Sequence, residues 1–148
     1  MTLNLNNECI FCSIISGDIP SSEVYKDDLV IAFMDISPVN KGHLLVIPNN
    51  HYEYLSDVPE EIAARMFTVG QKLAIAIRNS GVKCEGINFF LSDGEAAFQE
   101  VFHSHLHVFP RFKGDAFKID ADWSVNPSRT DLDEVAKKIS SSMQALSK

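Results

Sequence analysis

Residues 103–109 read His-Ser-His-Leu-His-Val-Phe, which places three of the five histidines of this 148-residue chain at every second position. Successive side chains of a β-strand point to opposite faces, so His103, His105 and His107 are predicted to lie in a row on one side. The residues between them then point toward a core. The outer two Cα atoms would lie about 13 Å apart, too far for one metal ion to bind all three rings. At least one imidazole is therefore available for nucleophilic or acid–base chemistry.

The composition is that of a globular protein of one domain. Hydrophobic residues make up 45% of the chain, and its length is sufficient to bury a core. The N-terminus, MTLNLNNECI, has neither the basic segment nor the sustained apolar run of a secretory signal. No stretch is apolar for long enough to span a membrane, so we expect a cytoplasmic protein without a membrane anchor. A net charge of −7 argues against a general nucleic-acid-binding surface.

The patterns of apolar residues predict a mixed α+β fold. Short apolar runs bounded by turn residues predict strands at 24–25, 29–34, 43–48, 86–91 and about 103–110. Helical spacing between Pro59 and Gly81 predicts one long helix, and an amphipathic segment capped by Thr130 or Asp131 predicts another, to about Ala145. Because the neighbours of the histidine segment are strands, we expect an antiparallel sheet with helices packed on it.

Two of the three cysteines form the sequence Cys9-Ile10-Phe11-Cys12. Without a secretory signal, such a pair is more typical of a metal site or a redox pair than of a disulfide framework. Cys84 has no obvious partner and is expected to be an ordinary thiol.

Four ordered segments of the chain resemble those of the histidine triad (HIT) family. Residues 103–109 match the signature His-φ-His-φ-His-φ-φ, where φ is apolar, within the longer match 99–111. Residues 11–20 resemble the N-terminal segment of the family, 33–38 its ribose-binding turn, and 42–51 its central strand. The resemblance covers about 9–115, and the predicted helix at 130–145 is a C-terminal extension. It implies a single domain over 1–148, with a five-stranded antiparallel sheet, one long and one or two shorter helices, and usually a homodimer.

The resemblance also implies a function, that of a nucleotide-binding hydrolase or transferase. His105 matches the nucleophile, which attacks the α-phosphorus of a nucleoside phosphate and forms a transient nucleotidyl-histidine; a neutral imidazole suits this role near pH 7. His107 and His43 match positions that hydrogen-bond the α-phosphate oxygens. Expected substrates are purine nucleotides such as diadenosine polyphosphates or nucleoside phosphoramidates. Substrate-binding positions implied by the resemblance are Asp35 for the ribose hydroxyls, Gln99 for a phosphate contact, Ser92, and Phe11, Ile14, Ile19, Phe33 and Ile36 around the base.

A second set of residues, Cys9, Cys12, His51 and His103, suits a tetrahedral zinc ion. Several HIT-related proteins, including galactose-1-phosphate uridylyltransferases, hold structural zinc on such a cysteine pair, a histidine and the first triad histidine. A closed four-ligand site would be structural rather than catalytic. The alternative is two reduced cysteines without a metal, and no organic cofactor is expected.

Four residues depart from the family pattern. Ser104 stands where the signature has an apolar residue, and Ser92 stands where many nucleotide-binding members have Asn. Phe98 and Glu100 occupy positions often filled by Gly and by Ser or Thr. These changes leave the nucleophile intact but bear on substrate preference. Three other functions stay open: adenylyl or uridylyl transfer, nucleotide-binding regulation with little activity, and hydrolysis by zinc bound at the triad.

Overall fold

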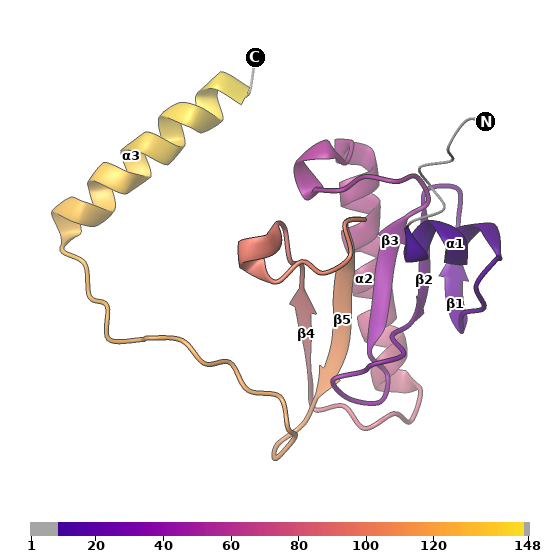
Figure 1. Cartoon of the computed structure of the whole chain (residues 1–148). Helices are drawn as coiled ribbons and strands as arrows, with labels where there is room; N and C mark the ends of the chain where they lie inside the picture. The colour runs from indigo at the N-terminus through magenta and orange to yellow at the C-terminus, as the bar shows by residue number, and fades with distance from the viewer. Residues whose placement is uncertain (1–8, 147–148) are drawn as a thin grey trace. The chain divides into compact units, whose positions relative to one another are not determined.

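Figure 1 shows a computed structural model of the chain, which describes residues 9–146. These residues form two compact units, one that ends at Phe117 and one that begins at Lys118. The first unit contains a five-stranded sheet in the order β1-β2-β3-β5-β4, and every neighbouring pair is antiparallel. Its strands are β1 Glu23–Lys26, β2 Val30–Met34, β3 Leu44–Pro48, β4 Gly86–Phe90 and β5 Leu106–Arg111. The predicted α+β fold with a five-stranded antiparallel sheet is confirmed.

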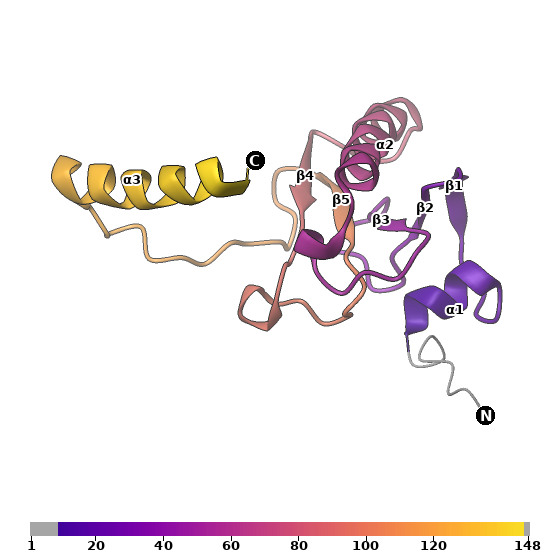
Figure 2. The ribbon, with the colours of Figure 1, turned by 90° about the horizontal axis from the view of Figure 1, so that it is seen from above.

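The long helix α2 (Glu60–Asn79) covers one face of this sheet, as Figure 2 shows. Its acidic first turn, Glu60 and Glu61, complements the helix dipole. An ideal Cβ built on Gly70 would lie 3.1 Å from Cδ2 of Leu106, so helix and sheet approach closely there. The core between helix and sheet is formed by Val30, Ala32, Leu44, Val46, Val58, Ile62, Met66, Val69, Leu73, Ile77, Leu106 and Val108.

The short helix α1 (Ile10–Ser16) lies on the opposite face of the sheet (Figure 2). It begins at Cys9, whose Sγ accepts a hydrogen bond from the backbone N–H of Cys12 at 3.4 Å, and it ends at Gly17 in a left-handed conformation. Phe11 anchors it in a second apolar cluster with Ile31, Phe33, Leu45 and Ile47. No local sequence pattern predicted this helix, because seven residues are too few to display a helical period.

Strand β5 begins at Leu106, so the predicted strand at 103–110 is wrong at its start. The backbone N–H of Ser104 donates to the carbonyl of Tyr52 at 2.7 Å instead of joining the ladder of the sheet. The alternation of faces nevertheless holds within the strand. Leu106 and Val108 lie in the α2 core, whereas His107 lines a cavity on the other face.

The second unit contains helix α3 (Arg129–Leu146). Ser128 caps its start: its Oγ accepts from the N–H of Asp131 at 3.1 Å, while Asp131 Oδ2 accepts from the N–H of Ser128 at 3.3 Å. The cap is therefore Ser128 rather than Thr130 or Asp131.

The first unit also contains two 3₁₀ turns, η2 Leu55–Asp57 and η3 Glu95–Ala97. Over residues 9–146, none of the helices combines the length and apolarity needed to cross a lipid bilayer.

Candidate active site

An open cavity of about 620 Å³ lies on the side of the sheet that carries α1. Every residue predicted for catalysis or substrate binding lines it except Gln99. These residues come from α1 and the loop that follows it, from the end of β2 and the turn after it, from the position before β3, from both ends of the segment between β4 and β5, and from β5 itself. The lining includes His43, His105, His107, Asp35, Ser92, Phe11, Ile14, Ile19, Phe33 and Ile36.

His105 has one ring nitrogen fixed and the other free. Its Nδ1 lies 2.8 Å from the carbonyl oxygen of His103. Because a carbonyl can only accept, Nδ1 carries the proton and the lone pair of a neutral ring is on Nε2. The side chain is only 6% exposed, and this burial lowers the pKa of His105. The cavity is thus lined by a neutral imidazole whose Nε2 can act as a nucleophile.

His43 and His107 form a chain of directed hydrogen bonds. The backbone N–H of Val39 donates to Nδ1 of His43 at 3.0 Å, so a neutral His43 carries its proton on Nε2. That nitrogen lies 2.9 Å from Nδ1 of His107 and donates to it. A neutral His107 then carries its own proton on Nε2. Both histidines line the cavity. The Nε2–H of His43 is used in the hydrogen bond to His107, so the Nε2–H of His107 is the donor that remains for a bound anion.

Burial keeps these rings neutral at physiological pH. Desolvation lowers the pKa of His107 to about 4, and the neighbouring His105 and His43 act in the same direction. Desolvation also lowers the pKa of His43, although Asp35 opposes that shift. The site therefore offers neutral donors and one neutral nucleophile rather than a cluster of imidazolium charges.

Asp35 divides its two carboxylate oxygens between two roles. Oδ1 accepts from the N–H of Ser37 at 2.8 Å and closes a local turn. Oδ2 lies 3.5 Å from Nε2 of His43 and 4.0 Å from Nδ1 of His107. The turn-forming role of Asp35 and its position in the cavity wall therefore occur together.

The ligand atoms of Asp35, His43 and His107 lie close enough together to be considered as a second metal site. The direction of the hydrogen bonds argues against one. The N–H of Val39 occupies Nδ1 of His43, so the proton of the neutral ring is on Nε2, which then has no lone pair for a cation. This geometry disfavours hydrolysis by zinc bound at the triad.

Gln99 was expected to contact phosphate, and the structure places it elsewhere. Its side chain is buried, with Oε1 accepting from the N–H of Gly94 at 2.8 Å and Nε2 donating to the carbonyls of Glu53 at 2.7 Å and Val101 at 3.1 Å. Within the described part of the chain it is not among the residues that line the cavity. The amide of Gln99 therefore holds the loop after β4 in place, because both of its N–H groups and its oxygen are hydrogen-bonded to the backbone.

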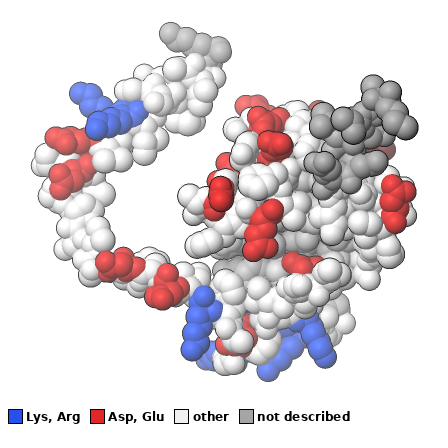
Figure 3. Space-filling model, in the orientation of Figure 1, with Lys and Arg blue, Asp and Glu red and all other residues white. Residues whose placement is uncertain are grey.

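Phe90 at the end of β4, and Phe98 and Glu100 in the segment after it, also line the cavity, although none of them was predicted to bind substrate. Phe90 looked like an ordinary strand residue. Phe98 and Glu100 were noted only as departures from the family pattern, which was the one available signal for them. The side chains around the cavity carry little positive charge, because no Lys or Arg is among the described residues that line it. Figure 3 shows acidic residues scattered over this view of the first unit, with Lys and Arg along its lower edge.

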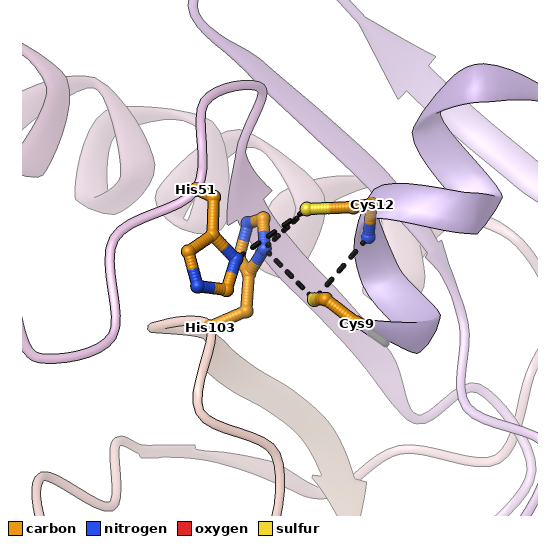
Figure 4. A group of neighbouring side chains, drawn as sticks. All are labelled: Cys9, Cys12, His51 and His103. Atoms are coloured by element: carbon orange, nitrogen blue, oxygen red, sulfur yellow. Dashed lines mark hydrogen bonds between the residues drawn. The ribbon is translucent and has the colours of Figure 1, made fainter. Parts of the chain in front are cut away.

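The four predicted metal ligands converge at the start of α1, as Figure 4 shows. Sγ of Cys9 and Sγ of Cys12 lie 3.5 and 3.6 Å from Nδ1 of His103, and Sγ of Cys12 lies 3.4 Å from Nδ1 of His51. A tetrahedral zinc ion with ordinary bond lengths separates a sulfur and a nitrogen ligand by about 3.6 Å. The four ligand atoms, all within 4.8 Å of one another, therefore fit zinc.

The surroundings of this cluster also suit a cation. Nε2 of His103 donates to the carbonyl of Pro48 at 2.9 Å, which leaves the lone pair of Nδ1 facing the sulfurs. Burial raises the pKa of the Cys12 thiol to about 11, and the adjacent Cys9 adds to this shift. Without a nearby positive charge the Cys12 thiol stays protonated, which argues against a reactive redox pair. A divalent cation would supply the charge that two thiolates require.

Comparison with known proteins agrees with this geometry. The family model described as the HIT domain matches residues 16–114. The chain is 50% identical over 110 residues to "Protein hit" of Bacillus subtilis, covering 74% of this chain and 75% of that protein. It is 38% identical over 114 residues to "Adenylylsulfatase HINT3" of Arabidopsis thaliana, covering 75% of this chain and 56% of that protein.

Solved structures are similar over nearly the whole chain. A HIT family member from Bacillus subtilis superposes with a TM-score of 0.81 at 44% identity, covering 90% of this chain and 95% of that one. A zinc-bound histidine triad family protein from Mycobacterium smegmatis gives 0.73 at 39%, covering 95% and 99%. A histidine triad nucleotide-binding protein from Candida albicans gives 0.80 at 29%, covering 93% and 99%. With its family model matched and its fold shared, the chain belongs to the HIT family.

Proposed function

We propose that this protein hydrolyses nucleoside phosphates through a covalent nucleotidyl-histidine on His105. The observation that carries the proposal is the bond from Nδ1 of His105 to the carbonyl of His103, which directs the Nε2 lone pair away from the backbone. The cavity that His105 lines is large enough for a nucleotide-sized ligand. Two similar proteins bear names that agree with this chemistry, an adenylylsulfatase and a nucleotide-binding protein.

The reaction takes two displacements at phosphorus. Nε2 of His105 attacks the α-phosphorus, and the leaving group departs with the electron pair of its bond to phosphorus and takes a proton from solvent. Water then attacks the same phosphorus, the N–P bond breaks with its electrons returning to Nε2, and the proton of the water passes to solvent. The Nε2–H of His107 stabilises the charge on the phosphoryl oxygens in both steps. His43 is a positioning residue, because it holds the tautomer of His107.

The remaining walls suit a purine nucleoside. Phe11 and Phe33, whose ring centroids are 5.7 Å apart, contribute an apolar surface for a base. Oδ2 of Asp35 is the carboxylate oxygen available to accept from a ribose hydroxyl, since Oδ1 is bonded to Ser37. Candidate substrates are diadenosine polyphosphates and nucleoside phosphoramidates.

Trapping the intermediate tests this proposal. Wild-type protein mixed with adenosine 5′-phosphoramidate labelled at phosphorus and quenched within milliseconds should carry up to one label per chain. The His105→Asn variant should carry none, whereas Cys84→Ser, altered at a residue that packs on the α2 core and is not among the cavity-lining residues, should label like the wild type. Sustained turnover by His105→Asn would refute the proposal. Adding a second phosphate compound as acceptor separates hydrolysis from nucleotidyl transfer, and binding without turnover would indicate a regulatory protein.

We also propose that Cys9, Cys12, His51 and His103 hold a structural zinc ion. The fit of their ligand atoms and the zinc-bound neighbour from Mycobacterium smegmatis support this assignment. Elemental analysis of purified protein should find about one zinc per chain, with loss of the metal in Cys12→Ser and retention in Cys84→Ser. Equal zinc content in both variants would contradict the assignment.

A homodimer is the third part of the proposal. β4 is an edge strand, and the rings of Phe67 on α2 and Phe89 on β4 stack at 5.6 Å while 58% and 37% exposed. A free edge beside an apolar patch is a surface that a second copy can cover. Sedimentation should give a dimer for the wild type and a monomer for Phe67→Asp. A wild-type monomer would contradict this part alone.

A further inference from the structure

A cluster of polar side chains lies where the loop between β2 and β3 meets the end of β5. Asn40 belongs to that loop, Arg111 ends β5, and Asp115 lies in the turn after it. Nδ2 of Asn40 donates to the carbonyl of Pro110 at 2.9 Å and to Oδ2 of Asp115 at 2.9 Å. Because a carbonyl and a carboxylate can only accept, both N–H bonds of the Asn40 amide are used. None of Asn40, Arg111 and Asp115 is among the described residues that line the cavity.

Asp115 is a fixed acceptor for Asn40. Its Oδ2 accepts from Nε of Arg111 at 2.6 Å, and its Oδ1 accepts from Nη2 of Arg111 at 2.9 Å. Such a two-bond ion pair is both directional and strong. The guanidinium is held in turn, because its Nη1 donates to Oδ1 of Asn88 on β4 at 2.8 Å. Arg111 also holds the pKa of Asp115 well below its usual range, so the carboxylate stays charged.

Asn40 also fixes the backbone that leads to His43. Its carbonyl accepts from the N–H of His43 at 3.1 Å, which closes a turn. Inside this turn Gly42 has a φ of 101°, and an ideal Cβ built on it would lie 3.2 Å from Cγ of Pro110. The pairing of β3 with β5 ends at Leu44. The contacts with Pro110 therefore hold the turn against β5 beyond the end of the ladder.

The hydrogen bond between His43 and His107 can run in either direction. Nε2 of His43 can donate to Nδ1 of His107, or Nδ1 of His107 can donate to Nε2 of His43. In the second arrangement Nε2 of His107 has no proton and cannot donate to a phosphoryl oxygen. Asp35 does not choose between them, because its Oδ2 faces both nitrogens, at 3.5 and 4.0 Å. The N–H of Val39 selects the first arrangement, since it can only donate and lies 3.0 Å from Nδ1 of His43.

We propose that Asn40, held by Arg111 and Asp115, is a positioning residue that sets the direction of this hydrogen bond from outside the cavity. Asn40 follows Val39 directly and closes the turn to His43. Its side chain therefore keeps Val39 and His43 at the separation that their bond requires. The use of this direction in catalysis rests on the proposed function, whereas the direction itself is a property of the protein without substrate.

Nitrogen-15 NMR of histidine-labelled full-length protein at pH 7.5 tests the proposal, because it reports which ring nitrogen carries the proton. Spectra are compared for the wild type, Asn40→Ala, Asp115→Asn and Asn49→Ala, and amide spectra of the same samples report whether each variant is folded. Asn49 is the matched control. Its Nδ2 also donates to a backbone carbonyl, that of Asp27, at 2.9 Å, but it lies just after the other end of β3.

In the wild type and in Asn49→Ala, both His43 and His107 should carry the proton on Nε2. In Asn40→Ala the ratio of Nε2–H to Nδ1–H should fall by roughly fivefold in both rings together, as expected for the loss of one net hydrogen bond. Asp115→Asn should shift the ratio in the same direction by a smaller factor, and it decides the question if Asn40→Ala does not fold. An unchanged ratio in the folded variant, or an equal shift in Asn49→Ala, overturns the proposal.

Turnover of adenosine 5′-phosphoramidate separates this inference from the reaction itself. The kcat of each variant should follow the fraction of His107 that carries its proton on Nε2. A fall in kcat for Asn40→Ala without a change of tautomer would indicate a merely structural role and overturn the proposal. If no protein turns over the substrate, the proposed function fails. The joint shift of both rings, measured without substrate, would still support positioning by Asn40.

Discussion

Lowering the pH from 7.5 to 5.0 is expected to remove about 2 kcal/mol of unfolding free energy through His107 alone. Burial lowers the pKa of His107 to about 4 in the folded protein, whereas an unfolded histidine titrates near the ordinary value of about 6.5. Below that pH the unfolded chain binds a proton that the folded chain does not. Stability is therefore complete above pH 6.5, falls as the pH drops below it, and levels off near pH 4.

Urea unfolding at several pH values between 7.5 and 5.0 measures this loss. The single tryptophan, Trp123, belongs to the second unit, so a Trp123→Phe background lets tyrosine fluorescence report on the first unit, which contains all three tyrosines. His107→Gln in that background is the reference, and a chelator keeps the cysteine cluster free of metal in both proteins. Other groups then titrate in both proteins, and the difference between the two curves isolates His107.

The expected result is a wild-type curve that falls about 2 kcal/mol further than the His107→Gln curve between pH 7.5 and 5.0. Parallel curves would refute the argument, because they would mean that His107 binds protons equally well in both states. A difference of opposite sign would mean that the imidazolium form is stabilised in the cavity.

Other outcomes follow from the same structure. His105→Asn should reduce kcat on the order of 10⁴-fold while the Kd of adenosine monophosphate changes by less than about threefold; substantial residual turnover would count against the nucleophile. The acid limb of kcat/KM should lie below pH 6.5, since burial lowers the pKa of His105, and a limb at or above 6.5 would exclude that cause. Cys12→Ser should cost at least about 2 kcal/mol of zinc-loaded stability and Cys84→Ser less than about 1, as urea midpoints would show. Gly70→Val should cost about 2 kcal/mol, because its Cβ would press on Leu106; an unchanged melting temperature would contradict this packing.

Much of the fold was accessible from the sequence because its signals are local. The alternation around Leu106 and Val108 and the helical period between Pro59 and Gly81 each report which face meets the core. The residues around the cavity were predicted in another way, from ordered sequence segments that resemble one family. Spacing alone did not indicate that Cys9 and His103, 94 positions apart, would meet.

The misplaced features are those decided by tertiary contacts. β5 starts late because Ser104 bonds to Tyr52, a residue that no local pattern connects to it. Gln99 turned inward because three backbone groups of neighbouring loops satisfy its amide. The hydroxyl of Ser104 is one of two buried side-chain polar atoms without a hydrogen-bond partner among the described residues. Leaving it unpaired costs stability. The departure of Ser104 from the apolar signature pointed to this position, but the sequence does not show whether the hydroxyl finds a partner.

The seven residues of α1 serve both sites at once. The helix begins at the cysteine pair, and its Phe11 meets the rings of His103 and His105 edge-on, with centroids 5.8 and 5.1 Å away. An ion held by the cysteines would thus steady one wall of the nucleotide cavity. Thermodynamic reciprocity then requires that the factor by which zinc tightens nucleotide binding equals the factor by which nucleotide tightens zinc binding. If the cysteine cluster holds zinc as proposed, a rising nucleotide concentration would help the protein to retain that ion when zinc is scarce.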